Sequence, residues 1–420
     1  MIAKTPPMGW NSWDCYGPSV DEETVRANAA YMAAHLKEYG WEYIVVDIQW
    51  SQPTAGSHEY EPFAPLCMDG FGRLMPAENR FPSAADGKGF APLAEYVHSL
   101  GLKFGIHIMR GIPRQAVHLN TPVKGTDRTA RQIAKTASIC CWNTDMYGVD
   151  PAKDGAREYY DSLFELYASW GVDFIKVDDI CRELPHEEDE LLLLSASLHA
   201  CGREMVLSLS PGPALPEKAE LYKQTANMWR ITDDFWDKWE LLYNMFERAE
   251  RWCIHAGGGH WSDCDMLPVG AIRQNDDPAN VTRFTRDEQI TMMTLWCLVR
   301  SPLMIGGEMT KLDDFTLGLL TDRGLLEVLN RTHSAHPLFR KTVDGCEQTA
   351  WFSSHIDGRS YYAALFNLSE RECVISARLP FAADFTAADV LSGTSAGRVT
   401  DTVAARVPAH GSVLFRLTRE

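Results

Sequence analysis

Short apolar runs alternate with segments of helical periodicity from residue 8 to about residue 330. Tyr43–Asp47 reads Tyr-Ile-Val-Val-Asp, for example, and a helical pattern over Pro92–Leu100 precedes the next run. Strands that alternate with helices indicate βα units and a parallel sheet, and eight repeats predict a closed (β/α)8 TIM barrel, an α/β fold, over residues 1–330. The eight predicted strands are Met8–Trp13, Tyr43–Asp47, Lys103–Ile108, Val172–Asp178, Met205–Ser210, Asn227–Thr232, His260–Asp265 and Leu298–Ile305.

The pattern changes after the barrel. Beyond residue 338, short β-rich runs such as Ser360–Phe366 and Ser412–Leu417 are joined by Gly, Asn and Asp turns, with no helical periodicity between them. This predicts an antiparallel β-sandwich over residues 338–420, with Arg331–Pro337 as the linker.

One connection inside the barrel region is unusually long. About forty residues, 110–150, separate the third predicted strand from the helix that begins near Gly155. Long insertions in compact domains are often functional, and this one would lie at the C-terminal rim of the barrel, where active sites form.

Polar and aromatic side chains mark the ends of most predicted strands. In a (β/α)8 barrel these ends converge on one pocket. A single aspartate there is usually a helix cap, but six strand ends together are hard to explain in that way. The residues are Asp47, Trp50, His107, Arg110, Lys176, Asp178, Asp179, Ser208, Ser210, Arg230, Asp233, Asp234, Asp263 and Asp265.

The alternation of side chains along a strand selects among these carboxylates. Asp178 shares a face with Lys176, and Asp234 shares a face with Arg230. The alternative pair, Asp179 with Asp233, would send both cations toward the helix layer, where an unpaired charge is costly. The pocket pair is therefore predicted to be Asp178 and Asp234.

Two carboxylates in one pocket are typical of glycoside hydrolysis, in which their separation decides between retention and inversion. Tryptophans near the rim, including Trp10, Trp13 and Trp142, favour a sugar substrate because flat rings stack on a pyranose, although core packing is the more common role for any one of them. The histidines are sparse and no HExxH motif occurs, so neither a metal nor another cofactor is expected. The sequence contains no GxSxG elbow, the motif that would support a serine triad.

Composition restricts the binding partners and the cellular compartment that can be expected. The formal net charge of -17 disfavours nucleic acid. No signal peptide and no membrane span are recognisable, and the 11 cysteines show no framework spacing, which together favour reduced thiols in the cytoplasm. The sequence is compatible with a homo-oligomer.

At these residues the sequence resembles the α-galactosidases of glycoside hydrolase family 27. The resemblance implies a retaining mechanism with Asp178 as nucleophile and Asp234 as acid/base, and sugar contacts from Trp10, Asp47, Lys176, Arg230 and Asp265. The matching blocks are Thr5–Trp13, Val45–Trp50, Phe174–Asp178, Trp229–Asp234, Asp263–Leu267 and Ser301–Leu303.

Three positions depart from the family pattern. The family's paired aspartates are here Asp47 and Ile48. Since that pair holds the 4- and 6-hydroxyls of galactose, the loss of one carboxylate costs a 6-hydroxyl about 1–3 kcal/mol, whereas β-L-arabinopyranose lacks this group. Ser208–Gly212 stands where the α-galactosidases have a glutamate near the 2-hydroxyl. A serine there, such as Ser210, resembles the α-N-acetylgalactosaminidases, but the residues that follow do not match them, and His107 replaces a usual tyrosine.

The sequence thus predicts a retaining exo-glycosidase that acts on a glycoside or oligosaccharide with a terminal α-D-galactose or β-L-arabinopyranose. α-N-Acetylgalactosaminidase activity is one alternative, and a catalytically inactive carbohydrate-binding barrel is the alternative outside enzymes.

Overall fold

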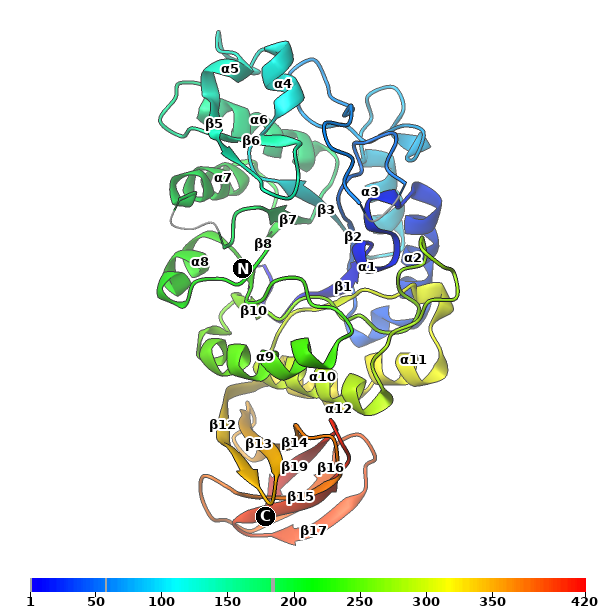
Figure 1. Cartoon of the computed structure of the whole chain (residues 1–420), viewed down its shortest axis with the longest axis vertical. Helices are drawn as coiled ribbons and strands as arrows, with labels where there is room; N and C mark the ends of the chain where they lie inside the picture. The colour runs from blue at the N-terminus through cyan, green and yellow to red at the C-terminus, as the bar shows by residue number, and fades with distance from the viewer. Residues whose placement is uncertain (1, 57–58, 183–185) are drawn as a thin grey trace.

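The computed structural model describes residues 2–56, 59–182 and 186–420. Eight parallel strands form one sheet in the order β10-β9-β8-β7-β3-β2-β1-β11. A parallel bridge between Leu267 and Ile305 connects the segment after β10 to β11, so the sheet closes on itself as a TIM barrel (Figure 1). The strands are β1 Met8–Asn11, β2 Tyr43–Val46, β3 Lys103–Met109, β7 Phe174–Asp178, β8 Val206–Leu209, β9 Met228–Arg230, β10 Trp261–Asp263 and β11 Leu303–Ile305.

Helices cover the outside of the barrel. Four of them, α2, α10, α11 and α12, begin with a side-chain cap that satisfies free backbone N–H groups: for example, Asp21 accepts from Thr24, and Thr285 forms a capping box with Glu288. The helices are α1 Trp13–Tyr16, α2 Glu22–His35, α3 Ala91–Ser99, α6 Ala156–Ser169, α7 Glu188–Ala200, α8 Ala219–Thr225, α9 Trp239–Trp252, α10 Arg286–Val299, α11 Asp314–Leu320 and α12 Arg323–Arg331.

The predicted eighth strand began too early. Leu298 and Val299 belong to α10, which ends at Arg300 in a left-handed conformation (φ 58°). In Leu298–Ile305, only Arg300, Ser301 and Pro302 separate the apolar end of a buried helix from an apolar buried strand. Short apolar stretches cannot by themselves distinguish a buried helix from a buried strand.

The long connection after β3 forms a small insert of its own. It contains β4 Ile112–Pro113, α4 Arg114–Leu119, α5 Ala130–Ile133, β5 Ala134–Ile139 and β6 Met146–Val149, with strand order β4-β6-β5. The insert lies at the end of the molecule opposite the C-terminal sheets (Figure 1).

A buried ionic network joins this insert to the barrel. Arg110, only 3% exposed, contacts Asp179 at 2.9 Å and Glu190 at 3.2 Å. Burial raises the pKa of Glu190 to about 7, against the opposing charge of Arg110 and the hydrogen bond from Tyr160. Glu190 also accepts the backbone N–H of Val149 in β6, so one carboxyl group holds the insert, α6 and α7 together.

The C-terminal strands form a six-stranded sheet, order β12-β13-β14-β19-β16-β17, and a two-stranded sheet, β15-β18, around a second apolar core. They pack on the barrel helices through stacking of Trp239 on His410 and an edge-to-face contact between Phe246 and Phe366. The strands are β12 Thr332–Val343, β13 Cys346–His355, β14 Ser360–Asn367, β15 Cys373–Arg378, β16 Phe385–Asp389, β17 Ser395–Val399, β18 Thr402–Val407 and β19 Ser412–Arg419.

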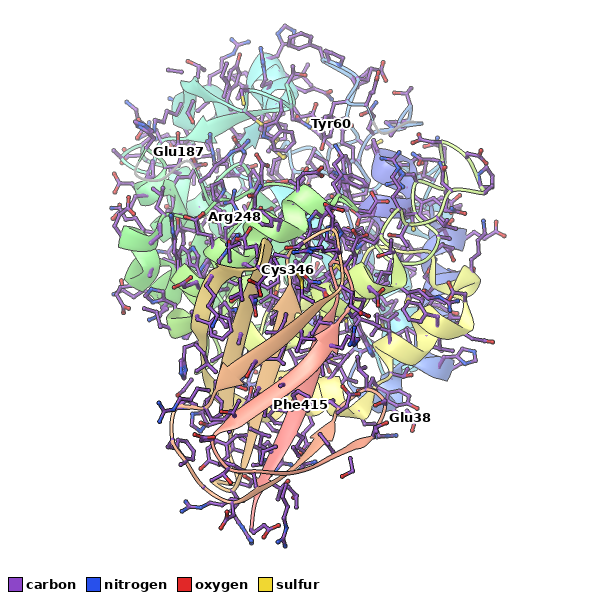
Figure 2. The ribbon with its side chains drawn as sticks, turned by 60° about the horizontal axis from the view of Figure 1, so that its bottom comes forward. Glu38, Tyr60, Glu187, Arg248, Cys346 and Phe415 are labelled. Atoms are coloured by element: carbon purple, nitrogen blue, oxygen red, sulfur yellow. A yellow bond between two sulfur atoms is a disulfide. The ribbon has the colours of Figure 1, made fainter. Side chains whose placement is uncertain are left out.

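Two expectations about this region need correction. The segment predicted as a linker is the start of β12, because its backbone pairs with the end of β13, Thr332 opposite His355. The cysteines are not all free: Cys346 and Cys373 form a disulfide between β13 and β15. Figure 2 shows Cys346 on the C-terminal sheets. The 27-residue separation carries no recognisable motif, so the sequence pattern could not reveal the pair.

Candidate active site

A cavity of about 250 Å³ opens where the barrel strands end. Because the barrel brings loops from distant parts of the chain together here, its wall mixes carboxylates, cations and aromatic rings. The lining residues include the carboxylates Asp14, Asp47, Asp178, Asp233, Asp234 and Asp265, the cations Lys176, Arg182 and Arg230, and the aromatics Trp13, Tyr60, Trp142, Phe235 and Trp236.

Asp178 is the last residue of β7 and is held as an anion. His107, on the neighbouring strand β3, lies with Nε2 3.1 Å from Oδ2 of Asp178, and the backbone N–H of Asp179 donates to Oδ1 at 3.0 Å. Burial alone would raise the pKa of Asp178, but the hydrogen bond and charge of His107 and the charge of Lys176 outweigh it and hold the pKa well below its ordinary value. The carboxyl side chain is 13% exposed.

Lys176 is fixed by a second buried carboxylate. Its Nζ lies 2.9 Å from Oδ2 of Asp47, which also accepts a hydrogen bond of 2.7 Å from the amide of Asn11. Burial would raise the pKa of Asp47, but the nearby charge of Lys176 lowers it below its ordinary value. Asn11, Asp47 and Lys176 come from or follow β1, β2 and β7, and β3 lies between β2 and β7 in the sheet.

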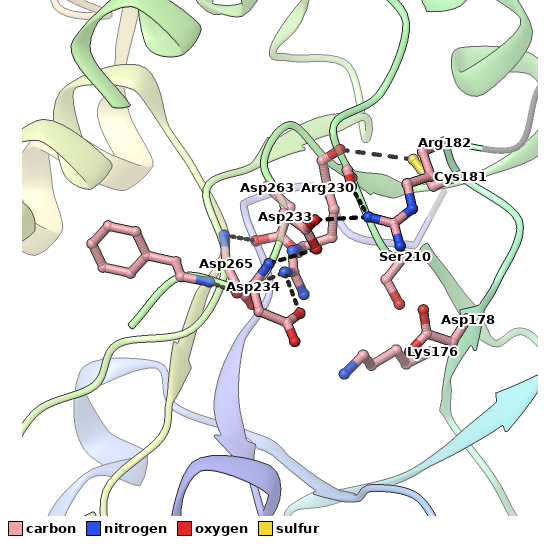
Figure 3. Close-up of polar contacts among 12 residues, drawn as sticks. Lys176, Asp178, Cys181, Arg182, Ser210, Arg230, Asp233, Asp234, Asp263 and Asp265 are labelled. Carbon is pink, nitrogen blue, oxygen red and sulfur yellow. Dashed lines mark hydrogen bonds and ion pairs between the residues drawn. The ribbon is translucent and has the colours of Figure 1, made fainter. Parts of the chain in front are cut away.

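Asp234 faces the cavity from the other side. Arg230, at the end of β9, donates to Asp234 at 3.1 Å and contacts Asp265 at 2.7 Å. Burial, together with the charge of Asp234, raises the pKa of Asp265 in spite of Arg230. Asp234 itself is 59% exposed, so solvent and substrate can reach its carboxyl group. Figure 3 shows Asp178 with Lys176 on one side of the open space and Asp234 with Arg230 and Asp265 on the other.

The two neighbouring aspartates have other partners. Asp179 turns away from the cavity and pairs with buried Arg110. Asp233 remains at the cavity mouth, 61% exposed, where it forms an ion pair of 2.7 Å with Arg182. The alternation of side chains predicted the direction of Asp179, whereas β9 ends at Arg230 and the chain bends beyond it, which leaves Asp233 and Asp234 both on the wall.

Five predicted sugar contacts line the cavity: Asp47, Trp142, Lys176, Arg230 and Asp265. Trp10, Ile48, His107 and Ser210 are not among the lining residues.

The structure explains these four positions individually. The indole of Trp10 is fully buried and donates to the carbonyl of Gly307 at 3.0 Å, so it is a core residue. Ile48 is 5% exposed and lies in a small apolar cluster that Trp13, Tyr60 and Trp142 cover. His107 lies behind Asp178, and the hydroxyl of Ser210 points to a backbone carbonyl.

Sequence reasoning placed Trp13 near the rim but missed Asp14 and Tyr60. The first predicted strand extended through Trp13, but β1 ends at Asn11 and α1 begins at Trp13, and this turn carries Trp13 and Asp14 onto the cavity wall. Tyr60 comes from a long loop after β2 without a pattern, and its ring stacks near Trp13 at 5.7 Å.

Asp14 is an unusual wall residue. It is 3% exposed, and its Oδ2 has no hydrogen-bond partner among the described residues. Burial, followed by the charges of Asp265 and Asp234, raises its pKa well above the ordinary value. These surroundings disfavour the charged form of this carboxyl group.

Over the described residues, no cluster of three or more His, Cys, Asp or Glu side chains has a geometry suited to a metal ion. Within the same residues, no helix is long and apolar enough to cross a membrane.

A TIM barrel whose strand ends present carboxylates, cations and aromatic rings to one cavity defines a glycoside hydrolase of the barrel type. Comparison with known proteins supports this class. A family model described as Alpha galactosidase A matches residues 146–331. A β-L-arabinopyranosidase from Geobacillus stearothermophilus, solved with arabinose, is 53% identical, with coverage of 100% of this chain and 98% of that chain and a TM-score of 0.95.

Two further relatives extend the range of sugars. A crystal structure from Bacillus halodurans C-125, assigned as an α-N-acetylgalactosaminidase, is 51% identical over 100% of this chain and 99% of that chain, with a TM-score of 0.89. Alpha-galactosidase A of Cellvibrio japonicus is 26% identical over 99% of this chain and 93% of its own length. The chain belongs to glycoside hydrolase family 27, which confirms the resemblance and the fold predicted from the sequence.

Proposed function

We propose that the protein is a retaining exo-glycosidase in which Asp178 attacks the anomeric carbon and Asp234 donates and then accepts the proton. The observation that carries the proposal is the contrast between the two carboxyl groups across one cavity. Asp178 is only 13% exposed and is held ionised by His107 and Lys176, as a nucleophile must be. Asp234 is open to the cavity, where a leaving oxygen and then a water molecule can reach it.

The remaining contacts fit a sugar in this cavity. Lys176 and Asp47 form a fixed donor and acceptor pair at 2.9 Å, and Arg230 presents a guanidinium group that Asp265 orients. Paired donors and acceptors of this kind bind hydroxyl groups, and Trp13 and Trp142 supply ring faces for the apolar side of a pyranose.

For the sugar itself, we favour β-L-arabinopyranose over α-D-galactose. Ile48 places an aliphatic side chain beside Asp47, behind the aromatic wall, and leaves a 6-hydroxyl without a carboxylate. The 53% identical relative is a β-L-arabinopyranosidase. α-N-Acetylgalactosaminidase is the second candidate, because the 51% identical relative carries that assignment and a serine such as Ser210 in this segment resembles that class of enzyme.

The proposal also covers the domain organisation and the cellular compartment. Residues 1–330 form the catalytic barrel and residues 338–420 the sandwich domain. We place the protein in the cytoplasm on the strength of nine free cysteines, although the Cys346–Cys373 disulfide is a feature more common in oxidising compartments.

Matched aspartate variants test the catalytic assignment. Asp178→Asn and Asp234→Asn should each lose nearly all turnover of the p-nitrophenyl glycoside, whereas Asp233→Asn, at the same cavity mouth, should keep most of it. Circular dichroism and thermal melting would show that all three variants fold. NMR of the first-formed product should show the anomeric configuration of the substrate. Full activity in Asp178→Asn, or an inverted product, would disprove the mechanism.

The substrate assignment needs a separate panel. The p-nitrophenyl β-L-arabinopyranoside, α-D-galactoside and α-N-acetylgalactosaminide should rank in this order by kcat/KM. No turnover of any of them by the folded wild-type protein would support a binding barrel instead.

A further inference from the structure

A second cavity lies beside the first and is built by the insert. Its volume is about 370 Å³, a size typical of small-molecule sites. One wall comes from the loop after β2, with Phe63 and Leu66, and the other from the insert, with Arg114, Thr144 and Tyr147. We propose that this cavity is a subsite for a neutral sugar unit in the leaving part of the substrate. The inference rests on the proposed exo-glycosidase function, because a leaving-group subsite requires a bond that is cleaved next to it.

The two cavities share the same two segments of chain. Tyr60 and Trp142 line the catalytic cavity, and Phe63 and Thr144, three and two residues further along, line the second one. Three residues of extended chain span at most about 10 Å. A di- or trisaccharide whose terminal sugar occupies the catalytic cavity can therefore reach the second cavity across the Tyr60–Trp142 edge, where the rings lie 5.4 Å apart.

The walls are held in place by direct hydrogen bonds. The side chain of Gln115 accepts from the backbone N–H of Leu66 and donates to its carbonyl, both at 2.9 Å. The backbone N–H of Phe63 donates to Thr144 at 2.8 Å. A cavity that is formed before the ligand arrives binds with less loss of entropy than one that must be ordered.

Phe63 is presented to solvent by an unfavourable backbone. Its side chain is 69% exposed and its φ is +60°, a left-handed conformation that costs a bulky residue about 1–2 kcal/mol. Such strain is characteristic of residues retained for binding rather than packing. An exposed ring at the edge of a cavity is a platform on which a pyranose can stack.

The polar groups select the class of ligand. The guanidinium group of Arg114 lies over the rings of Phe63 and Tyr147, at 5.0 and 4.7 Å, and makes no ion pair within 4.0 Å among the described residues. On the same cavity, Asp145 is 8% exposed and accepts from Gln49 at 2.5 Å. The negative charge of a uronate would be repelled by Asp145, and the positive charge of a cationic sugar would be repelled by Arg114. A hydroxyl group, which both donates and accepts, suits a wall that offers both.

The test compares a short and a long leaving group. The short substrate is the p-nitrophenyl glycoside that the wild-type protein turns over fastest, and the long one carries the same terminal sugar on a neutral disaccharide. Phe63→Ala should lower kcat/KM for the long substrate about tenfold, the loss expected for one stacking contact, and leave the short one within about twofold. Arg114→Gln should act in the same direction. Phe381→Ala, an exposed aromatic on the C-terminal sheets, is the matched control.

The outcomes separate the two proposals. If the wild-type protein turns over no p-nitrophenyl glycoside, the proposed function fails. If it does, but Phe63→Ala leaves the long substrate unchanged or lowers both substrates equally, the subsite is refuted. A uronate-bearing disaccharide that is preferred over the neutral one would overturn the assigned ligand class. Thermal melting of each variant ensures that the comparison is made on folded protein.

Discussion

Asp14→Asn offers a direct thermodynamic test of the carboxyl chemistry in the cavity. Asparagine has nearly the shape of a protonated aspartate but does not titrate. In the folded protein, burial and the neighbouring charges of Asp265 and Asp234 raise the pKa of Asp14 well above its ordinary value. In the unfolded chain an aspartate titrates near about 3.9. Between these two pKa values, the folded protein holds a proton on Asp14 that the unfolded chain has lost.

The sign and size of the effect follow from proton linkage. A folded state that binds one more proton than the unfolded state loses about 1.4 kcal/mol of unfolding free energy for each unit of rising pH. Asp14→Asn removes this loss, so we expect the variant to be more stable than the wild type at pH 7. The advantage should grow by about 3 kcal/mol between pH 5 and pH 7 if Asp14 stays protonated throughout.

Urea unfolding followed by tryptophan fluorescence at pH 5, 6 and 7 measures this difference. Asp233→Asn, which removes a carboxyl group that is 61% exposed at the same cavity mouth, is the control and should show no comparable trend. Parallel curves for wild type and Asp14→Asn across the pH range would refute the reasoning that Asp14 is a neutral buried acid.

Three further results are expected. Ile48→Asp should raise galactoside activity relative to arabinopyranoside and lower the melting temperature, because it puts a carboxylate into an apolar cluster; an unchanged substrate ratio would show that Ile48 has no influence on the sugar. Cys346→Ser should cost about 3–4 kcal/mol of stability under oxidising conditions, the chain-entropy value for a 27-residue loop, and nothing under reducing ones; equal losses in both would argue against the bond. EDTA should leave turnover unchanged, whereas loss of activity that zinc or magnesium restores would point to a metal.

The fold was predictable because barrel strands repeat a simple pattern: a buried β-rich run followed by polar residues at its end. That pattern also placed Asp178, Lys176 and Arg230, since each lies within or at the end of a strand whose side chains alternate. It failed where the chain leaves the strand. Trp13 and Asp14 reach the cavity through a turn into α1, Tyr60 comes from an irregular loop, and Trp10 packs in the core. Loop conformation depends on tertiary contacts that no local periodicity records.

The cavity wall also has a consequence for the design of ligands. Six carboxyl groups, those of Asp14, Asp47, Asp178, Asp233, Asp234 and Asp265, face three cationic side chains, Lys176, Arg182 and Arg230. Asp178 is held ionised on this wall, so the field at the reacting carbon favours a positively charged guest. A sugar analogue with a protonated nitrogen in its ring matches both this field and the oxocarbenium-like charge of the transition state. Such iminosugars should therefore inhibit more strongly than the corresponding free sugar, and a carboxylated analogue should hardly bind.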